Sequence, residues 1–489
     1  MNAISFTSLF FIFIFLPITI GGYYIFKGRA KNVFLIVMSL IFYAMGEPRM
    51  VLLLIANIII NYCFGLILAR EYKSKAIKLM LLLIMLIWNF GLLFYYKYFA
   101  FTLTNANLIL GTSITVPSIL MPLGISFYTF RTVSFCLDVY WKTVPKQKNI
   151  FDVALYIAFF PQVVMGPISK YNDFSKQLNN REFNLEKFLD GAKRIILGMF
   201  KKLVIADTVG VVVDKIFAMG DERTVLLAWM GILGYLVQLY YDFAGYSDIA
   251  IGIGNMMGFD TPENFNYPYI SKTITEYWSR WHITLGTWMK NYLYTPIFRA
   301  CQDKNITIMG CDVLALLGVW LFAGIWHGTG WNFLLYGLYY FVFIAAERLI
   351  ENYKKQRRKK LKIKKQPETT AHKIFSHVYF FIVLIFGQLM FRSDSVTSFG
   401  KFFADMFGIN GNAFSSTLTG FYWKQLAVAF IIGAIFCFPI IPKIKAWLSD
   451  GKKQTVLKIA TPIIYAVLLL VAIAFAFTST YQAFIYFQF

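Results

Sequence analysis

The stretch MVLLLIANIIINYCFGLILA at residues 50–69 decides the fold, and IKLMLLLIMLIWNFGLLFYY at 77–96 repeats its character. The first stretch holds no charged side chain, and the second holds only Lys78. About 20 apolar residues in a helix cross the roughly 30 Å of hydrocarbon in a bilayer. Both stretches are therefore predicted to be membrane-spanning helices.

Similar apolar runs lie on both sides of this pair, near residues 5–26, 32–45, 372–391, 424–442 and 459–477. The chain is 58% hydrophobic and only 15% charged, against about 25% charged in a soluble domain. The runs do not alternate as the strands of a membrane barrel would. We predict an all-α, polytopic membrane protein with about 10–12 transmembrane helices plus re-entrant or interfacial helices.

Positive charge gathers in short connections, which gives the expected orientation. Five such connections lie at residues 27–31, 70–78, 142–148, 354–365 and 443–458. The positive-inside rule places them in the cytoplasm. We expect a multi-pass protein of the cell membrane with its N-terminus on the extracytoplasmic side.

The number of apolar stretches predicts that one of them does not cross. Between the basic connections at 142–148 and 354–365 lie five, near 151–168, 188–217, 225–255, 306–326 and 328–350. An odd number of crossings cannot return the chain to the same side, so at least one must be re-entrant, broken or flat. The breaks at 159–162 and 166–167 and the turn around His327 are the places we expect for it.

We predict one membrane domain over residues 1–489, because no soluble domain, long low-complexity linker or internal repeat is visible. Polar residues crowd into the middle, so a catalytic core is expected at about 120–345. A cytoplasmic basic loop is expected at 352–371. Its nine Lys or Arg in residues 354–365 favour contact with anionic membrane lipids rather than with nucleic acid.

Residues 275–294, TEYWSRWHITLGTWMKNYLY, are predicted to form a helix. Glu276 and Arg280 would form a pair one turn apart on it. Trp278, Trp281, Leu285 and Trp288 recur at three- and four-residue steps. We expect this segment to be packed into the protein or to lie near the membrane interface, with its tryptophans as a belt.

Two of the four histidines, His282 and His327, lie in this aromatic central third. Imidazole is the side chain best suited to accept and return a proton near neutral pH. Glycines around His327 would let a substrate or another helix approach it, although His327 could equally cap or cross-link helices. A metal site is not expected, because two histidines 45 residues apart lack the spacing and number of zinc ligands.

The motifs of serine hydrolases, P-loop ATPases and dinucleotide enzymes are absent from the sequence. Acyl transfer to a hydroxyl remains open: a neutral histidine takes the hydroxyl proton while the oxygen attacks a thioester, and nearby donors hold the oxyanion. Donors could come from Arg280, Trp326, Trp331 and Asn332. A proton-coupled transporter or flippase is the alternative of another class, although transporters more often carry internal repeats and acidic residues in their spans.

The chain also resembles the membrane-bound O-acyltransferase family, close to its alginate O-acetyltransferase branch. The motifs that carry this resemblance cover nearly the whole chain and read PLGISFY (122–128), FFPQ (159–162), GPI (166–168), KLVIAD (202–207), YDFAGYSD (241–248), ENFNYPY (263–269), WHITL (281–285), WHG (326–328) and FIYFQF (484–489).

The resemblance implies that His327 is the catalytic histidine and His282 a second active-site histidine, inside a central tunnel through the membrane. It implies no bound cofactor, and an acyl thioester donor, acetyl-CoA or an acyl carrier protein, arriving from the cytoplasm. An extracytoplasmic transferase would complete O-acetylation of a cell-surface polysaccharide. D-alanyl transfer toward teichoic acid is the alternative within the family. A wider substrate or tunnel set is expected at Asp242, Asn264, Asn266, Trp278, Arg280, Trp326, Trp331 and Asn332.

Overall fold

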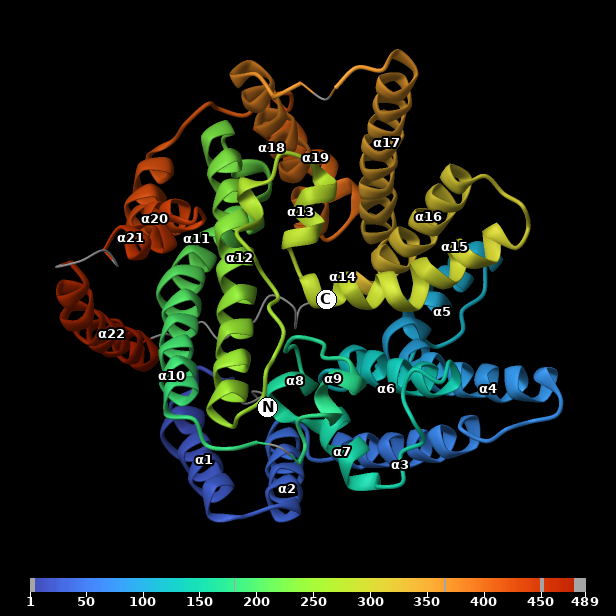
Figure 1. Ribbon diagram of the computed structural model, residues 1–489. Coiled ribbons are helices and arrows are strands. Elements are labelled where there is room, and N and C mark those ends of the chain that lie inside the picture. The colour runs from blue at the N-terminus through green and yellow to red at the C-terminus, as the bar shows by residue number, and fades with distance from the viewer. Residues whose placement is uncertain (1–4, 180, 365, 449–452, 479–489) are drawn as a thin grey trace. The chain divides into compact units, whose positions relative to one another are not determined.

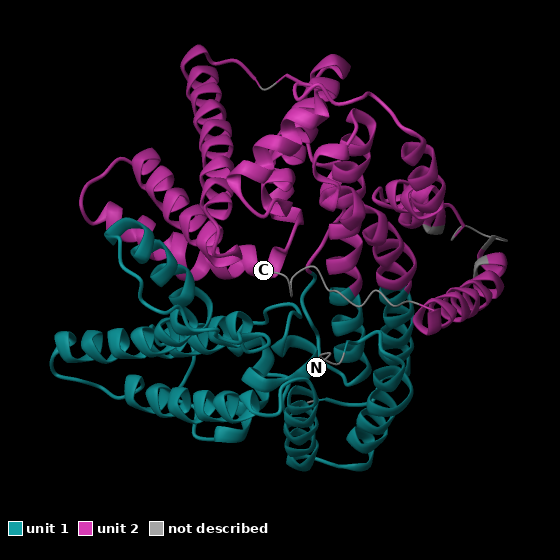
Figure 2. Cartoon of the chain, turned by 180° about the vertical axis from the view of Figure 1, so that it is seen from behind, with its two compact units in different colours: residues 1–199, 246–263 teal, residues 200–245, 264–489 magenta. Residues whose placement is uncertain are grey.

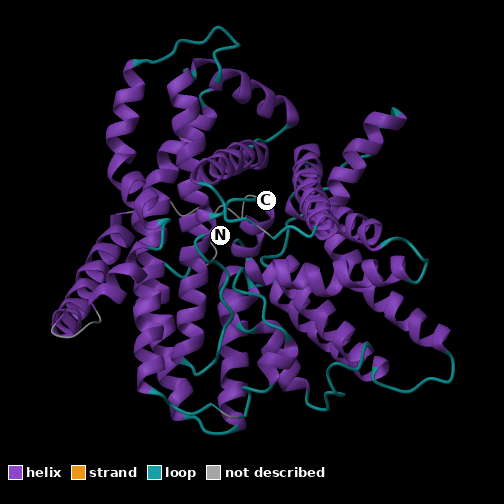
Figure 3. Cartoon of the chain, turned by 45° about the horizontal axis from the view of Figure 1, so that its top comes forward, coloured by secondary structure: helices purple, strands orange, loops and turns teal. Residues whose placement is uncertain are grey.

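The fold is helical throughout the part of the chain that the structure, a computed structural model, describes: residues 5–179, 181–364, 366–448 and 453–478. Figure 3 draws helices and loops in these ranges and no strand. The predicted all-α class is confirmed.

Nine helices in the described ranges are long and apolar enough to cross a membrane. They are Arg29–Gly46, Met50–Leu68, Lys75–Leu110, Val225–Met256, Ile308–His327, Trp331–Leu361, Thr370–Arg392, Thr417–Phe436 and Gln454–Thr478. A shorter apolar helix covers Phe11–Ile25. The chain is therefore a polytopic membrane protein, as predicted.

The chain divides into two compact units, which Figure 2 colours separately. Unit 1 is Met1–Met199 with Tyr246–Glu263, and unit 2 is Phe200–Gly245 with Asn264–Phe489. Helix α12 (Val225–Met256) contributes residues to both. The single membrane domain predicted over 1–489 stays a prediction, because this division into units does not test it.

Unit 1 holds the first helices of the chain, coloured blue to green in Figure 1. They are η1 (Phe11–Phe15), α1 (Leu16–Ile25), α2 (Arg29–Gly46), α3 (Met50–Leu68), α4 (Lys75–Leu93), η2 (Phe94–Tyr98), α5 (Phe99–Leu110), α6 (Ile125–Tyr140), α7 (Ile150–Ala158), α8 (Phe160–Val163), α9 (Tyr171–Ser175) and α10 (Leu185–Met199). The chain after 77–96 stays helical to Leu110, and Gly111 ends the helix in a left-handed conformation.

The apolar stretch near 151–168 forms no spanning helix. It breaks at Phe159 into the short helices α7 and α8, and nearly every residue from Val153 to Ile168 is buried. Arg131 of α6 is fully buried against the break and donates to the Gln162 side chain and to the Tyr156 carbonyl. Protein therefore surrounds a broken helix, which is the condition for tolerating irregular backbone at membrane depth.

Unit 2 holds the remaining helices, drawn from green to red in Figure 1. They are η3 (Phe200–Ala206), α11 (Asp207–Ala218), η4 (Gly220–Glu222), η5 (Pro268–Ile270), α13 (Ile274–Arg280), α14 (Ile283–Met289), η6 (Lys290–Tyr294), α15 (Thr295–Gln302), α16 (Ile308–His327), α17 (Trp331–Leu361), α18 (Thr370–Arg392), α19 (Val396–Met406), α20 (Thr417–Phe436), α21 (Ile440–Leu448) and α22 (Lys453–Thr478).

Two segments of unit 2 differ from the sequence-based prediction. The basic run does not form a loop over 352–371, because α17 continues to Leu361 and α18 begins at Thr370. The span predicted at 424–442 begins earlier, at Thr417, and ends at Phe436. Pro439 lies in the break between this helix and α21, and a proline there lacks the backbone donor that would continue the first helix.

Glycines bring α16 and α17 into close contact. A Cβ on Gly337 would lie 2.3 Å from the Trp320 carbonyl oxygen, and one on Gly324 would lie 2.6 Å from the Phe333 carbonyl oxygen. A Cβ on Gly328 would overlap the Phe333 ring. Glycines near His327 were expected to admit either a substrate or another helix. Gly324, Gly328 and Gly337 admit a helix, and this packing fixes the end of α16 that carries His327.

Candidate active site

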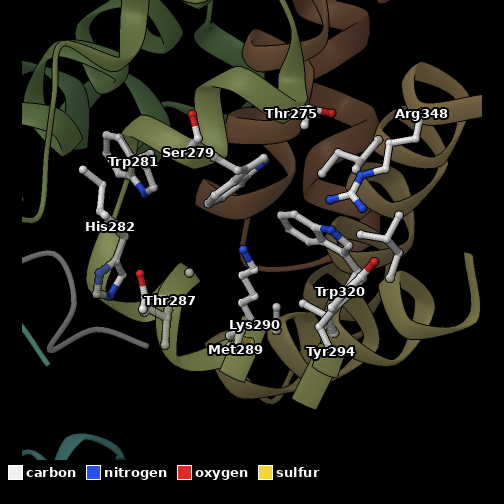
Figure 4. Close-up of a pocket in the computed structure, with 18 of the residues that line it drawn as sticks. Thr275, Ser279, Trp281, His282, Thr287, Met289, Lys290, Tyr294, Trp320 and Arg348 are labelled. Carbon is white, nitrogen blue, oxygen red and sulfur yellow. The ribbon is translucent and has the colours of Figure 1, made fainter. Parts of the chain in front are cut away.

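A cavity of about 570 Å³ lies within unit 2 (Figure 4). Its walls come from α13, α14, η6, α16 and α17, and both His282 and His327 border it. Trp278 borders it as well and packs against the Trp320 ring at 4.9 Å. The two central histidines, 45 residues apart in sequence, therefore share one cavity.

The predicted single helix over 275–294 is wrong, because the chain breaks at His282. Helix α13 begins with the Thr273 side chain accepting from the Glu276 amide, and α14 starts again at Ile283. Between them His282 adopts a left-handed backbone with φ of 45°. A residue other than glycine rarely adopts this conformation, and it does so mainly where surrounding contacts fix it.

Asn264 supplies those contacts. Its backbone oxygen accepts from the Ile283 amide at 3.0 Å. Its side-chain oxygen accepts from the Thr284 amide at 3.3 Å and the Thr284 hydroxyl at 3.0 Å, and lies 3.0 Å from His282 Nδ1. A backbone amide can only donate, so the Asn264 atom that faces it is the oxygen.

The Asn264 oxygen determines the tautomer of His282. An oxygen accepts only, so His282 Nδ1 carries the proton and Nε2 carries the lone pair. The ring is 3% exposed, and Nε2 is buried with no hydrogen-bond partner among the described residues. His282 lies outside the nine long apolar helices, and burial lowers its pKa to about 3. The imidazole is therefore neutral and has an acceptor atom for a substrate donor.

His327 is the last residue of α16 and is 8% exposed. Its ring lies edge-on to Tyr336 of α17, with 5.6 Å between centroids, and to Phe391 of α18, with 5.0 Å. Three helices of unit 2 thus hold one imidazole at the cavity wall. His327 is not sealed inside a helix contact, since it borders the cavity.

Two cations that the sequence did not single out also line the cavity. Figure 4 shows Lys290 of η6 and Arg348 of α17 extending toward its interior. Asp312 accepts from Arg348 and from the Tyr294 hydroxyl, each at 2.5 Å. Asp312 holds Arg348 in place, and the exposed ammonium of Lys290 borders the same space. The cavity can therefore accept an anionic group at this side.

Asp242 takes part in a buried ion cluster rather than in the cavity wall. Lys202 of η3 lies 2.6 Å from both Asp207 and Asp242, and each side chain is at most 5% exposed. In hydrocarbon an unpaired charge would be costly, so the cluster neutralises Asp242 within the fold.

Besides Asn264, five further predicted residues lie outside the cavity lining. The predicted pair is confirmed, with Arg280 3.0 Å from Glu276. Arg280 also donates to the carbonyl of the exposed Asn266. Asn332 donates to the Ser393 carbonyl at 2.7 Å, Trp326 is 5% exposed and Trp331 is 57% exposed.

Of the two placements predicted for this segment, Trp281 and Trp288 take the one inside the protein rather than the one at an interface. They are 3% and 4% exposed and pack in the protein, because the helix break turns them toward neighbouring aromatic rings. Trp281, for instance, stacks on Tyr277 with 5.6 Å between centroids.

No cluster of three His, Cys, Asp or Glu side chains within the described ranges could hold a metal ion.

Comparison with known proteins places this site in a family. The family model of the membrane-bound O-acyltransferases matches residues 143–391, which include both histidines. The chain is 36% identical over 440 residues to a protein of Pseudomonas syringae pv. tomato named probable alginate O-acetylase, covering 88% of this chain and 81% of that protein.

Two other relatives have different acceptors in their names. The peptidoglycan O-acetyltransferase of Helicobacter pylori is 32% identical, covering 83% of this chain and 80% of that protein. The teichoic acid D-alanyltransferase of Bacillus subtilis is 29% identical over 279 residues, 55% of this chain and 68% of that protein. With the family model covering half of its length and relatives covering most of it, the chain belongs to the membrane-bound O-acyltransferase family.

Proposed function

We propose that this protein is a membrane O-acetyltransferase that takes an acetyl group from a cytoplasmic thioester for O-acetylation of an extracytoplasmic polysaccharide. The observation that carries the proposal is that two histidines border the same cavity. One of them, His282, is neutral, and Asn264 fixes its tautomer. The relatives named as O-acetylating enzymes cover more of the chain than the D-alanyltransferase does, which favours acetyl as the acyl group.

The two histidines have distinct roles in this reaction. His327 takes the proton of the attacking hydroxyl, the hydroxyl oxygen bonds to the thioester carbonyl carbon, and the carbon–sulfur bond breaks. The proton then passes to the leaving thiolate, which departs as a thiol. His282 accepts at Nε2 a hydrogen bond from a second donor group of the acceptor, and this contact orients the attacking hydroxyl.

Lys290 and Arg348 suit the donor. Acetyl-CoA and carrier-protein thioesters both carry phosphate, and cations in a partly enclosed cavity bind phosphate well. Arg348 lies less than two helical turns before Lys354, where the basic run begins. The positive-inside rule places that run in the cytoplasm, so the donor enters from that side. An extracytoplasmic transferase then receives the acetyl group and completes polysaccharide modification.

The donor experiment uses the full-length protein in nanodiscs with glycerol in excess as the acceptor hydroxyl and either radiolabelled acetyl-CoA or radiolabelled D-alanyl carrier protein. We expect label to leave acetyl-CoA only. Loss of label from the carrier protein alone would replace the proposal with D-alanyl transfer, and retention of both labels would refute acyl transfer from these donors.

Histidine variants test the assigned site. His327→Ala should abolish label transfer, and His282→Ala should lower it by about 10²-fold or more, with both proteins still inserted in the membrane. His372→Ala, an exposed change of the same kind, is the control. Full activity in both site variants would remove the assignment. Normal acetylation with lost flux of another substrate in His327→Ala would favour the transporter alternative.

A further inference from the structure

A second cavity, of about 380 Å³, lies in unit 2 and shares no residue with the first. It lies between the end of α11, the end of α18 and helix α19. Its lining is predominantly charged and polar, so it is unsuited to an acyl chain. Its volume is at the lower end of the range for small-ligand sites, about 300–1,000 Å³.

Two ion pairs, one buried and one partly exposed, fix the wall of this cavity. Arg223 pairs with Asp405 at 2.8 Å, with both side chains at most 7% exposed, and Arg392 pairs with Asp214 at 2.8 Å. Asn410 donates to Asp405 at 2.7 Å.

Two stacked aromatic rings lie between the guanidinium groups. Phe217 and Phe402 are 4.4 Å apart, with Arg392 over Phe217 at 4.8 Å and Arg223 over Phe402 at 4.2 Å. Each guanidinium is thus held by a carboxylate on one side and a ring on the other. The cavity is preformed, which lowers the entropic cost of binding.

The mouth of the cavity carries donors and acceptors together. Lys401 is an exposed donor, and Asp221 and Asp394 are exposed acceptors. The lining holds four carboxylates and three cations in all. A ligand rich in hydroxyls can use both kinds of group because each hydroxyl donates and accepts. The excess of one carboxylate disfavours an anionic ligand.

The side of the membrane on which the cavity lies restricts the class of ligand further. Helix α18 begins at Thr370, just after the basic run, and ends at Arg392 in the cavity wall. With the basic run in the cytoplasm, one crossing places this cavity on the extracytoplasmic side.

We propose that the cavity bounded by Arg392, Lys401, Asp221 and Asp394 is an extracytoplasmic binding site for an uncharged saccharide unit of the acceptor glycan. The inference rests on the proposed function, since it assigns a place on this chain to the polysaccharide. It distinguishes a neutral glycan from a polyuronate such as alginate.

Saccharide binding is measured by saturation-transfer NMR on the full-length protein in nanodiscs, which avoid sugar-based detergents. The probes are a neutral N-acetylglucosamine trisaccharide and a mannuronate trisaccharide. We expect saturable binding of the neutral probe, and at least fivefold weaker binding of the uronate. No saturable binding of the neutral probe, or tighter binding of the uronate, would overturn the inference.

Ser398→Trp tests the cavity itself, because Ser398 lines it from an exposed helical position. We expect the neutral probe to bind at least tenfold more weakly. Thr397→Trp, the adjacent exposed position outside the lining, is the matched control and should keep binding within twofold. Equal binding by both variants would place the saccharide elsewhere. Elution volume and melting temperature establish that both variants are folded.

Asp394→Lys tests the charge argument without blocking the cavity. It turns an excess of one carboxylate into an excess of one cation, so uronate binding should strengthen about two- to fivefold. Unchanged uronate binding would contradict the assignment of specificity to these charges.

The donor experiment uses no saccharide, so the two proposals fail separately. Label transfer without saccharide binding would leave the O-acetyltransferase in place and remove this site. Capture of a protein by a photo-crosslinker at Ser398 in cells, with no saccharide binding in vitro, would make the cavity a protein-docking surface and refute the saccharide.

Discussion

Asn264 acts on His282 from two directions, through its backbone and through its side chain. The backbone oxygen holds the amide that follows the left-handed residue, while the side-chain oxygen receives the Nδ1 proton. Asn264 does not line the cavity, so it is a positioning residue. Because orientation and tautomer both decide whether Nε2 can accept, this one side chain should have a large effect on rate.

Substitutions at Asn264 distinguish a role in positioning His282 from a role in packing alone. Asn264→Leu removes the acceptor, and acetyl transfer should fall by about 10²-fold. Asn264→Asp keeps an acceptor, and its negative charge raises the pKa of His282 because it favours imidazolium. Activity that requires neutral imidazole should then fall off at a higher pH, so the acidic limb of the pH–rate profile moves upward.

The readouts are single-turnover rates from pH 4 to 9 for the two variants and the unmodified protein. Identical profiles for the Leu and Asp variants would refute the tautomer argument, since only the Asp variant retains an acceptor for Nδ1.

Lys290 should act on donor binding rather than on chemistry. Lys290→Gln removes a cation from the cavity, and KM for acetyl-CoA should rise about tenfold, with kcat changed far less. The effect should shrink as salt is raised, because salt screens charge interactions. Lys304→Gln, an exposed change outside the cavity, is the control. A fall in kcat at constant KM would instead place Lys290 in the chemical step.

At this scale the sequence identified part of the site. The rarity of histidine and the resemblance both led to His282 and His327, and the cavity brings them together. Arg348 was missed because it comes just before the basic run, and Lys290 because a lone lysine in a partly polar helix looks like an ordinary solvated charge. Only the fold places these two cations, far apart in sequence, at one cavity.

Among the elements, the broken helix around His282 is the most informative. The apolar spacing of 275–294 continues across the break, so periodicity alone predicts one helix. The interruption depends on the contact with Asn264, 18 residues away in sequence, which no local pattern contains. The break in the stretch at 151–168 was easier to predict, because the sequence itself contains the prolines and the glycine that interrupt a helix there.

The contact between α16 and α17 should be sensitive to a single methyl group. Gly337→Ala would place a Cβ about 2.3 Å from a backbone oxygen, so the helices must separate. We expect destabilisation of about 1–3 kcal/mol and lower activity, because α16 carries His327. Melting temperature in nanodiscs and the label-transfer rate measure both effects.

Gly420→Ala is the matched control, since it lies in a long apolar helix with nothing within 4 Å of the new Cβ. Equal melting temperatures for the two variants would show that the glycine contact carries no packing constraint.

For the whole molecule, the distribution of charge predicts its orientation in the membrane. The basic connections place residues 354–365 inside, and the crossing by α18 then places α19 outside. If residues 151–168 do not cross, the other four apolar stretches make an even number of crossings and return the chain to the cytoplasm. The broken helices α7 and α8 within 151–168 agree with this count.

Cysteine labelling in intact cells tests this orientation in a Cys63→Ala background. Thr397→Cys should react with a membrane-impermeant maleimide, whereas Lys355→Cys should react only after lysis. Both positions are exposed, so access depends on the side of the membrane. The opposite pattern would invert the topology and move the saccharide cavity to the cytoplasm.

The ion cluster of Lys202 with Asp207 and Asp242 constrains how the protein is made. Helix α12 brings Asp242 into the bilayer, and its counter-charge stands on η3, synthesised earlier. Because a lone carboxylate in lipid is costly, α12 should leave the insertion machinery already paired with the preceding helix, as a hairpin. Lys202→Met should therefore deplete the protein from membranes, and adding Asp242→Asn should restore part of it on immunoblots. Equal abundance of all forms would mean that the helices enter lipid one at a time, and that the charges meet only afterward.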